Sequence, residues 1–349
     1  MSDKYRLSVH LLQNEAKGLR EGRRHEEWFQ AIDPAYKTKF LPSIQLKLGD
    51  RQIFVISLYT AWRCVRRTDS IVIGGWESPA YWLLLLAAKI MRRRCVGFYE
   101  STLESQRFKS GVIDACRNLF FRSMDAIVVP GPASKAAVLR AGVDENNIYE
   151  GFNSVDGQRI ASKVAAARTR SPLQPETPHR YLFVGQLIKR KNVASLVRAM
   201  LTIKDGELHI VGDGADRQEL ESMTRHLGLA EKVFFHGQAS QDELVNYYAQ
   251  CHTLALVSTE EVWGLVANEA LAAGMHLVVT DVCGCVPSIR EMDGVFVTSL
   301  NQRSIDESLL RSALEYRGYI EKPKILAQGP ESFAQIFSKA IEGSHHAPS

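Results

Sequence analysis

The sequence predicts two α/β domains, each built on an open, parallel and doubly wound sheet. With 349 residues, the chain is too long for one ordinary hydrophobic core and suits two domains of roughly 150 to 180 residues. Short apolar runs alternate with helix-length segments, which is typical of a parallel sheet covered by helices on both faces. Prolines at positions 172, 175 and 178 indicate a stiff, extended connector between the two halves.

The alternation is clearest in the second half. Five short apolar runs there are predicted strands, at residues 180–185, 207–212, 232–237, 253–257 and 276–281. The helix-length segments between them are 193–201, 216–227, 242–249 and 265–273. Strands this short and this apolar are typical of a sheet that is buried on both faces, so this half is expected to form one doubly wound domain.

The first half shows the same alternation of strands and helices, but less regularly. Its predicted strands are 5–12, 70–75, 95–100 and 126–131, and its predicted helices are 79–93, 111–124 and 133–141. We place the join between residues 156 and 180, which gives a first domain at 1–160 and a second at 161–325. The remaining segment, 326–349, is expected to hold a last helix at 331–341 that packs back toward the first domain, and then a disordered tail.

Composition and charge narrow the possible partners. Hydrophobic residues make up 45% of the chain and charged residues 23%, as in soluble globular proteins. The net charge is +4, yet residues 1–170 alone carry 27 Lys and Arg against 17 Asp and Glu. This basic half favours an anionic neighbour such as nucleic acid, an anionic membrane surface or a phosphorylated substrate. Because it shows no recognised nucleic-acid-binding motif, we expect no nucleic acid partner.

We expect a cytoplasmic protein, with peripheral attachment to the inner face of the cell membrane as a further hypothesis. No secretory signal opens the chain, and no apolar run reaches the roughly 18 to 20 residues of a spanning helix. The longest run, 81–91, is followed by three arginines. It predicts either a buried helix with a basic end or a surface element that touches anionic lipid headgroups. The six cysteines show no zinc-site spacing, so reduced thiols are expected.

A candidate anion site follows the fourth predicted strand of the second half. Ligands of open parallel sheets gather at the carboxyl ends of the strands, and segment 258–266 lies at such an end. It enters a predicted helix that stops at Gly274. Unpaired amides near Gly264, Leu265 and Val266 would attract a phosphate, and the glycine removes a side chain that would block its approach.

Two carboxylates, Glu261 and Glu269, flank this helix start. Eight positions of helix amount to at most roughly 12 Å, so the pair could hold two ends of one ligand. Carboxylates accept hydrogen bonds from sugar and ribose hydroxyls, which indicates a nucleotide-diphosphate sugar. A solvated pair on a surface helix is the alternative.

The loop after the first predicted strand of this half joins Gly185 to three consecutive cations at 189–191. Cations at a helix start could offset the charge that grows on a leaving diphosphate, although a solvated basic face is the alternative. Two further strands end in glycine, at Gly212 and Gly237. The first of these lies in a G-D-G turn rather than a GxGxxG motif, which counts against a nicotinamide or flavin dehydrogenase.

These stretches resemble the C-terminal domain of family 4 retaining glycosyltransferases, also called glycosyl transferases group 1. The matching segments are FVGQLIKRKN from Phe183, LHIVGDG from Leu208, VFFHGQ from Val233 and STEEVWGLVANEALAAGMHLVVTD from Ser258. Their order and spacing cover roughly residues 180 to 300, and the last is the most specific. The resemblance implies the GT-B fold, in which two Rossmann-like domains face a cleft.

The resemblance also implies residue roles. Glu261 would contact the donor sugar, Glu269 the nucleotide ribose and Lys191 the diphosphate. The family's arginine position in the same loop is Gln186, so Lys189 or Arg190 could take its place. The implied donor-binding set is Gly185, Gln186, Arg190, Lys191, Gly212, Gly237, Gly264, Leu265, Val266 and Glu269. No metal is expected, because cations and helix amides can stabilise the diphosphate.

The first half matches the family less specifically. The clearest stretches are IVVPG from Ile127 and the turn 153–156. Family members usually open with a strand and a glycine-rich loop, for which residues 14–18 are a poor equivalent, so the first strand could be missing. Members often place a histidine after a middle strand of this domain, and here Glu100 occupies that place as a third catalytic candidate beside Glu261 and Lys191. Residues 74–77 are candidates for lining the acceptor site.

The predicted function is transfer of a hexose, with retention, from a GDP- or UDP-sugar to a saccharide or lipid-linked saccharide acceptor. The resemblance implies a place in bacterial polysaccharide or lipopolysaccharide synthesis. The alternative is a degenerate member that binds nucleotide, or partners an active enzyme, without catalysis.

Overall fold

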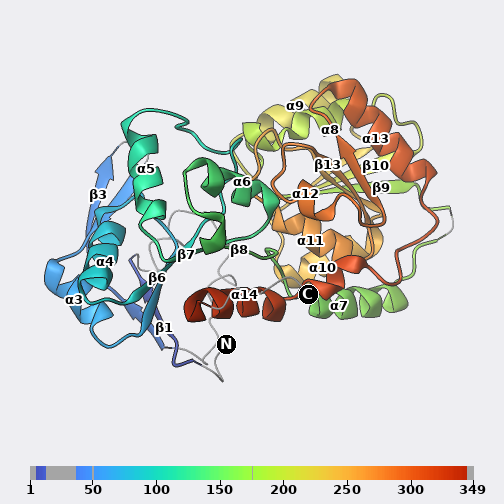
Figure 1. The fold of residues 1–349 in the computed structure, drawn as a ribbon. Coiled ribbons are helices and arrows are strands. Elements are labelled where there is room, and N and C mark those ends of the chain that lie inside the picture. The colour runs from blue at the N-terminus through green and yellow to red at the C-terminus, as the bar shows by residue number, and fades with distance from the viewer. Residues whose placement is uncertain (1–4, 13–36, 49–50, 175, 344–349) are drawn as a thin grey trace. The chain divides into compact units, whose positions relative to one another are not determined.

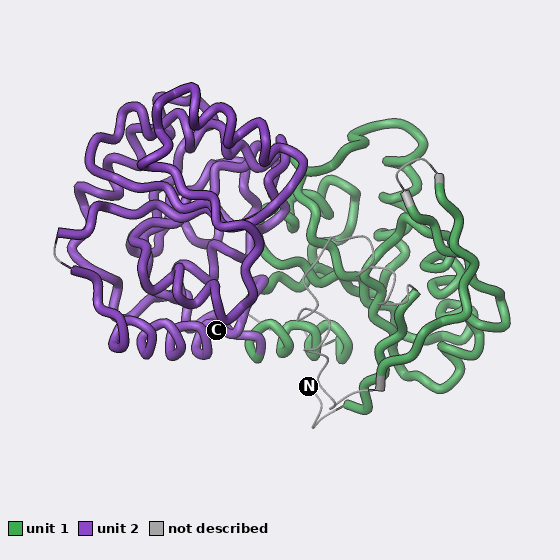
Figure 2. Tube along the Cα trace, turned by 180° about the vertical axis from the view of Figure 1, so that it is seen from behind, with its two compact units in different colours: residues 1–151, 331–349 green, residues 152–330 purple. Residues whose placement is uncertain are grey.

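A computed structural model describes residues 5–12, 37–48, 51–174 and 176–343 of the protein. The chain forms two compact units (Figure 2). Unit 1 comprises residues 1–151 and 331–349, and unit 2 comprises residues 152–330. The predictions for residues 14–18 and for the tail from residue 344 lie outside the described residues.

Unit 2 is built on one parallel sheet of six strands (Figure 1). In chain order these are β9 (His179–Val184), β10 (Gly206–Val211), β11 (Val233–Gly237), β12 (Thr253–Leu256), β13 (His276–Thr280) and β14 (Val295–Thr298). Their spatial order is β11-β10-β9-β12-β13-β14. The chain therefore builds outward from β9 in one direction and then, at β12, in the other, which defines a doubly wound sheet.

Helices cover both faces of this sheet. They are α7 (Gly157–Arg170), α8 (Val193–Ala199), α9 (Arg217–His226), α10 (Gln241–Gln250), α11 (Leu265–Ala272), α12 (Val286–Ile289) and α13 (Gln302–Leu314), with short 3-10 turns η2 (Lys189–Lys191) and η3 (Lys324–Ala327). Two apolar cores, one on each face, share the strands, so that Leu254 and Leu256 belong to one and Ala255 to the other. The five strands and four helices predicted for this half are confirmed within one or two residues, whereas α7, α12, α13 and β14 were not predicted.

Helix α7 corrects the predicted connector. Residues 157–170 are a helix of unit 2 whose N-cap, Asp156, accepts a hydrogen bond from the Arg159 amide at 3.0 Å. Val164 and Ala167 are buried in the core that α10 and α11 share. The alanines and arginines of this segment are strong helix formers, and the two units divide before them, between Gly151 and Phe152.

Aromatic and histidine side chains gather at the amino edge of the same sheet. His179, at the start of β9, stacks on His252, just before β12, with ring centroids 4.8 Å apart. Burial lowers the pKa of His179 to about 3 and that of His252 to about 4, with neighbouring charges adding to the effect. The guanidinium of Arg168 lies 3.1 Å from the ring centroid of Tyr319 beside them. Neutral histidines are therefore part of the packing at this edge.

Unit 1 contains a parallel sheet of four strands in the order β5 (Ser70–Ile73), β6 (Arg94–Phe98), β7 (Ala126–Val129) and β8 (Ile148–Glu150). Helices α4 (Pro79–Ile90), α5 (Val112–Arg122) and α6 (Pro132–Arg140) connect them, with a 3-10 turn η1 (Glu145–Asn147) before β8. Cys95, Ile127 and Val129 face a core formed with these helices. The strand order follows the chain order, so the described part of this sheet has no reversal point.

The opening of unit 1 departs from the predicted α/β rhythm. Strand β1 (Ser8–Leu11) pairs in parallel only with β2 (Lys37–Phe40) and does not join the four-stranded sheet. An antiparallel pair follows, β3 (Ile44–Leu48) with β4 (Arg51–Val55), and then helix α3 (Leu58–Val65). Of these elements only the first strand was predicted.

Helix α14 (Pro330–Glu342) covers the second face of the unit 1 sheet. Phe333 and Phe337 pack on Phe98 of β6, with ring centroids 6.0 and 5.5 Å away. The guanidinium Nε of Arg94 donates to the Ala340 carbonyl at 2.8 Å. The chain thus leaves unit 1, forms unit 2 and returns to complete unit 1.

None of the helices in the described ranges is both long enough and apolar enough to cross a membrane. All six cysteines are free thiols, and Cys95, Cys251, Cys283 and Cys285 are buried.

Candidate functional site

The carboxyl edge of the unit 2 sheet brings two of the predicted loops together. Strands β9 and β12 are neighbours at the point where the sheet reverses direction, which is where ligands of doubly wound sheets bind. The loop after β9 carries the cations 189–191, and the loop after β12 carries Glu261. The Thr259 amide donates to the Arg190 carbonyl at 2.8 Å and so ties the two loops to each other.

Glycines let the loops after β9, β10 and β11 approach closely. The Gly185 amide donates to the Val211 carbonyl at 3.0 Å, and the Gly212 amide donates to the Gly237 carbonyl at 2.6 Å. Gly212 has a φ of 141°, and a Cβ there would lie 1.8 Å from the carbonyl oxygen of Gly185. A side chain cannot be accommodated at that contact. These three predicted glycines therefore shape the floor of the site through backbone contacts.

Lys191 and Glu261 form an ion pair at the reversal point. The Lys191 ammonium contacts the Glu261 carboxylate, and each side chain is only 12% exposed. The Glu261 main chain is fixed as well, because its carbonyl accepts from the Gly284 amide at 3.0 Å. A largely buried ion pair depends on both partners, so these two predicted residues form one structural element.

The other polar residues of the loop after β9 differ in their surroundings. The Arg190 guanidinium donates to the Glu260 carbonyl at 3.2 Å and lies 3.9 Å from the Glu261 carboxylate. The Lys189 ammonium is instead paired with Glu219 on α9, at 2.6 Å. Arg190, not Lys189, therefore accompanies the ion pair. Gln186, at the family's arginine position, is exposed.

Helix α11 begins at the same edge. Its N-cap, Gly264, is in the left-handed region with a φ of 90°, and a Cβ there would lie 2.6 Å from Leu256. The Ala267 amide bonds back to the Gly264 carbonyl at 2.8 Å. Within the described residues, the amides of Leu265 and Val266 have no hydrogen-bond acceptor. The helix therefore presents two free N–H groups, as anion-binding helix starts do.

Glu269 lies in the second turn of α11 and is held by one hydrogen bond. The Tyr248 hydroxyl on α10 donates to its carboxylate at 2.5 Å. Burial raises the pKa of Glu269, and the Tyr248 hydrogen bond opposes that shift. Burial also raises the pKa of Tyr248 well above its usual value, so the hydroxyl remains a donor. Sequence reasoning missed Tyr248, because only the packing of α10 brings it to the glutamate.

Asn268 and Trp263 stabilise the loop before α11. The Trp263 indole N–H donates to the Asn268 side-chain oxygen at 3.1 Å, and the Asn268 amide nitrogen donates to the Asn153 carbonyl at 2.6 Å. Both side chains are buried. The segment that carries Glu261 is therefore fixed by a hydrogen-bonded network of buried side chains, which sequence reasoning also missed.

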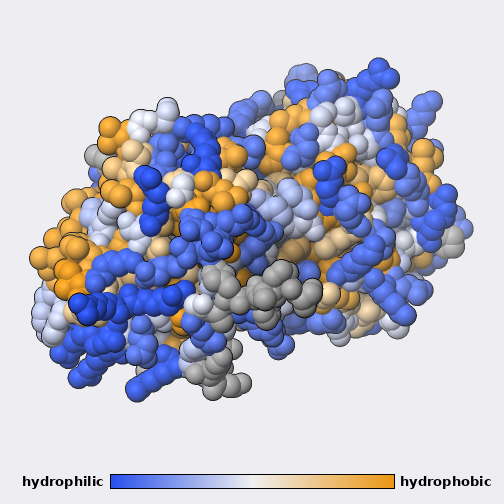
Figure 3. Space-filling view, viewed as in Figure 1, coloured by the Kyte–Doolittle hydropathy of each residue, from blue (hydrophilic) through white to orange (hydrophobic). Residues whose placement is uncertain are grey.

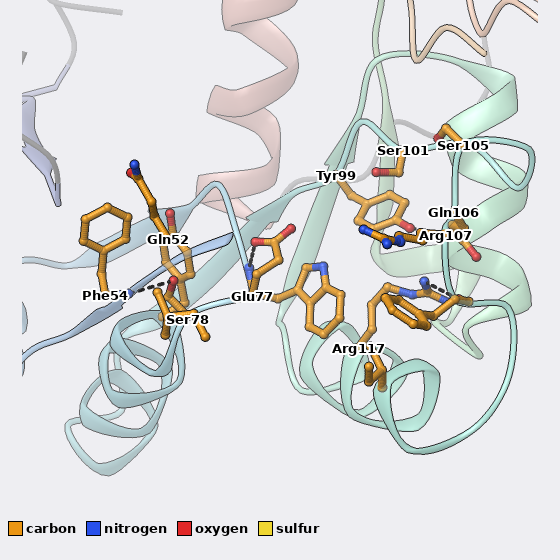
Figure 4. A pocket seen from close by; sticks show the side chains of 15 residues that line it. Gln52, Phe54, Glu77, Ser78, Tyr99, Ser101, Ser105, Gln106, Arg107 and Arg117 are labelled. Carbon is orange, nitrogen blue, oxygen red and sulfur yellow. Dashed lines mark hydrogen bonds between the residues drawn. The ribbon is translucent and has the colours of Figure 1, made fainter. Parts of the chain in front are cut away.

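Unit 1 holds a separate pocket of about 500 Å³ (Figure 4). Its walls come from β4, from the loops after β5 and β6, and from helices α4 and α5. The Gln106 side chain donates to the Tyr99 hydroxyl at 2.8 Å, while its other amide atom, Oε1, is buried without a hydrogen-bond partner in the described structure. Trp76 and Glu77, which were predicted to line the acceptor site, line this pocket.

The pocket combines aromatic faces with polar groups. Arg117 is 6% exposed and donates to the Phe108 carbonyl at 3.1 Å while it pairs with Asp114. Glu100 does not line the pocket, although Tyr99 and Ser101 on either side of it do. Its side chain is exposed and its carbonyl accepts from the Ser134 hydroxyl at 2.6 Å.

Solved structures establish the class of fold. The crystal structure of HepE from Anabaena in complex with UDP matches with a TM-score of 0.68 at 17% identity, over 98% of this chain and 92% of that one. The apo form of the lipopolysaccharide outer core galactosyltransferase WaaB matches with a TM-score of 0.68 at 16% identity, over 88% and 85% of the two chains. The protein has the GT-B fold.

Sequence comparison adds a similarity at the level of family. Residues 166–326 match the family model of the glycosyl transferases group 1, so this part of unit 2 is similar to that family. An uncharacterized glycosyltransferase of Methanocaldococcus jannaschii is 38% identical over 128 residues, which are 36% of this chain and 33% of the relative. The lipopolysaccharide core biosynthesis glycosyltransferase LpsD of Rhizobium meliloti is 26% identical over 233 residues, which are 66% and 62% of the two chains. The aligned parts thus span about one third and three fifths of these relatives.

Proposed function

We propose that the protein is a retaining glycosyltransferase that moves a hexose from a nucleotide-diphosphate sugar to a saccharide or lipid-linked saccharide. The observation that carries the proposal is the Lys191–Glu261 pair, which lies beside Arg190 at the reversal point of the unit 2 sheet. The free amides of Leu265 and Val266 begin a helix at the same edge. Cations, amides and a carboxylate together suit a diphosphate joined to a sugar.

Each group has a defined task in the proposed donor complex. Lys191, Arg190 and the α11 amides would bind the diphosphate oxygens, and Glu261 would accept hydrogen bonds from sugar hydroxyls. Glu269 would accept hydrogen bonds from the ribose hydroxyls, with Tyr248 fixing its orientation. Because the ligand takes over both Lys191 and Glu261, donor binding would replace their direct ion pair with contacts to the two parts of the donor.

The proposed reaction breaks the bond between the anomeric carbon and the diphosphate oxygen and forms a bond from that carbon to an acceptor oxygen. The acceptor hydroxyl gives its proton to the departing diphosphate oxygen, and the nucleoside diphosphate leaves. Negative charge grows on the leaving oxygens, where Lys191, Arg190 and the amides would stabilise it without the help of a metal ion. Glu100 of unit 1 remains our candidate for a further catalytic group.

A UDP-sugar is the first donor to test. HepE was crystallised with UDP and with UDP-glucose, and a GDP-sugar is the second choice. The names of two similar proteins, LpsD and WaaB, refer to lipopolysaccharide core synthesis, which supports the proposal of a lipopolysaccharide or polysaccharide pathway. The unit 1 pocket is our candidate acceptor site, because aromatic faces and polar groups side by side suit sugar rings. We further propose a cytoplasmic location with peripheral attachment to an anionic membrane surface.

The decisive test measures donor binding and turnover separately. Thermal shift with a panel of UDP- and GDP-sugars identifies the donor, since a ligand that binds the folded state raises the melting temperature. Release of the nucleoside diphosphate then reports hydrolysis or transfer. We expect Glu261→Ala to abolish release, and Lys189→Met, which alters a cation paired away from the site, to retain it. The proposal fails if no nucleotide sugar stabilises the protein.

A degenerate, non-catalytic member is the second candidate, because Gln186 replaces the family's arginine. If the wild-type protein binds a donor but never turns it over, this candidate is correct and our proposal of catalysis is wrong. Gln186→Arg then distinguishes the cause. Turnover gained by that variant would show that the missing cation limits activity.

A further inference from the structure

Helix α3 exposes three large apolar side chains. Leu58 is 67% exposed, Tyr59 65% and Trp62 41%. Positions three and four apart share one side of a helix, and the rings of Tyr59 and Trp62 stack with centroids 5.9 Å apart. Single exposed apolar residues are common on soluble proteins, but a group on one short helix marks an interaction surface.

The same helix is rich in arginine. Arg63, Arg66 and Arg67 are all exposed, and the Arg66 guanidinium lies 4.6 Å from the centroid of the Trp62 ring. Between Asp50 and Asp69 the sequence has four arginines and no acidic residue. Tryptophan, tyrosine and arginine are the side chains that favour the boundary between lipid headgroups and acyl chains.

Helix α4 extends this surface. It packs on α3 in a small core that includes Ala61 and Ala80, and it exposes Leu86 by 50% and Ile90 by 72%. Residues 78–99 contain one lysine and three arginines but no acidic residue. Figure 3 shows apolar side chains gathered over the region where Figure 1 places β3, α3 and α4, next to hydrophilic ones.

We propose that α3 and the exposed side of α4 dock the protein on an anionic lipid surface. Leu58, Tyr59 and Trp62 enter the headgroup boundary, while the arginines contact lipid phosphates. The sequence placed this contact in the apolar run 81–91, but α4 buries Leu85 and Ala88 in the core of unit 1. The main contact therefore belongs to α3, which no sequence pattern had indicated.

The positive charge of this surface favours a membrane over a second copy of the chain as its binding partner. Two copies meeting through this face would bring their arginines together without any acidic residue from these segments to pair with them, and like charges at an interface are unfavourable. An anionic bilayer supplies both the apolar boundary and the negative charge. The surface thus fits a lipid headgroup layer.

The position of this surface agrees with a lipid-linked acceptor. Strand β4 lines the unit 1 pocket and is followed in the chain by α3. The pocket residue Ser78 is the N-cap of α4. Helix α4 therefore begins at the pocket, and α3 follows the strand that lines it. This part of the inference rests on the proposed function, whereas membrane docking itself does not depend on catalysis.

Vesicle flotation tests the docking surface. We use the full chain with vesicles of phosphatidylcholine alone or with about one third phosphatidylglycerol, at low and high salt. We expect binding only to the anionic vesicles, weakened by salt. Arg63→Gln, Arg66→Gln and Arg67→Gln should each reduce partitioning by about fivefold. Leu58→Ser with Trp62→Ser should reduce it by more than about tenfold.

Leu314→Ser is the matched control, because Leu314 of α13 is 73% exposed and lies in unit 2. It should leave vesicle binding unchanged. The inference is overturned if the wild type does not bind anionic vesicles at low salt, or if the α3 variants bind as the wild type does. It is also overturned if the wild type is a dimer in solution and Leu58→Ser with Trp62→Ser makes it a monomer. Release of nucleoside diphosphate from a soluble donor, measured on the same variants, keeps a failure of docking distinct from a failure of catalysis.

Discussion

Replacing Lys191 by methionine should destabilise unit 2 even without any ligand. The substitution removes the ammonium but keeps most of the side-chain volume, and it leaves the Glu261 carboxylate, 12% exposed, without its main partner. Breaking a buried ion pair from one side costs about 3 to 5 kcal/mol. The Arg190 guanidinium remains 3.9 Å away and offsets part of this, so we expect about 3 kcal/mol.

Chemical denaturation and thermal melting measure this effect. We expect the melting temperature of Lys191→Met to fall by about 6 to 12 °C, and the addition of Glu261→Gln to restore more than half of the loss, because the double variant no longer buries a lone charge. Arg190→Met is the control, since that side chain is 43% exposed and should cost at most about 1 kcal/mol. The reasoning is refuted if Lys191→Met and Arg190→Met cost the same, or if Glu261→Gln restores nothing.

Three further predictions follow from the geometry of unit 2. Gly264→Ala should cost about 1 to 3 kcal/mol in denaturant titrations, because its φ is 90° and alanine is strained there; unchanged stability would contradict this. Stability should fall as the pH drops from 6.5 to 5, by about 1.5 kcal/mol for each of His179 and His252. Burial holds the folded-state pKa values near 3 and 4, so only the unfolded chain takes up protons in this range, and replacing either histidine by phenylalanine should flatten the pH profile of the unfolding free energy. Tyr248→Phe should raise the pKa of Glu269 further by removing its hydrogen bond. Donor binding, measured by thermal shift against pH, should then be lost at higher pH than in the wild type; an identical pH profile would show that Glu269 does not bind the donor as an anion.

The second half could be predicted because its strands are buried on both faces and end in glycine. Such strands appear in the sequence as short apolar runs, and Gly185, Gly212 and Gly237 mark where three of them turn. Lys191 and Glu261 are 70 residues apart in sequence. They meet because the sheet reverses direction between the strands that precede them. The family resemblance pointed to both residues, but not to their ion pair.

Two misses in the prediction have identifiable causes. The prolines after residue 170 favoured a connector between the two domains. The sequence just before them is instead a helix, with Asp156 as its N-cap and an alanine-rich run as its body. The antiparallel pair β3–β4 was overlooked, although Ile44 and Leu46 alternate with polar residues and Gly49-Asp50 separates the two strands. That pattern is typical of a β-hairpin. It was overlooked because only parallel strands joined by helices were expected in this half.

The return of the chain to unit 1 affects the order in which the protein can fold during synthesis. Strand β6 is synthesised early, but the face of it that packs on Phe333 and Phe337 stays uncovered until α14 has been synthesised. All of unit 2 leaves the ribosome in between, and domains generally fold as they emerge. Unit 2 can therefore be complete while unit 1 still exposes an apolar sheet face. A newly made chain is most open to aggregation or chaperone capture in that interval, which ends only when residues 331–343 have been added.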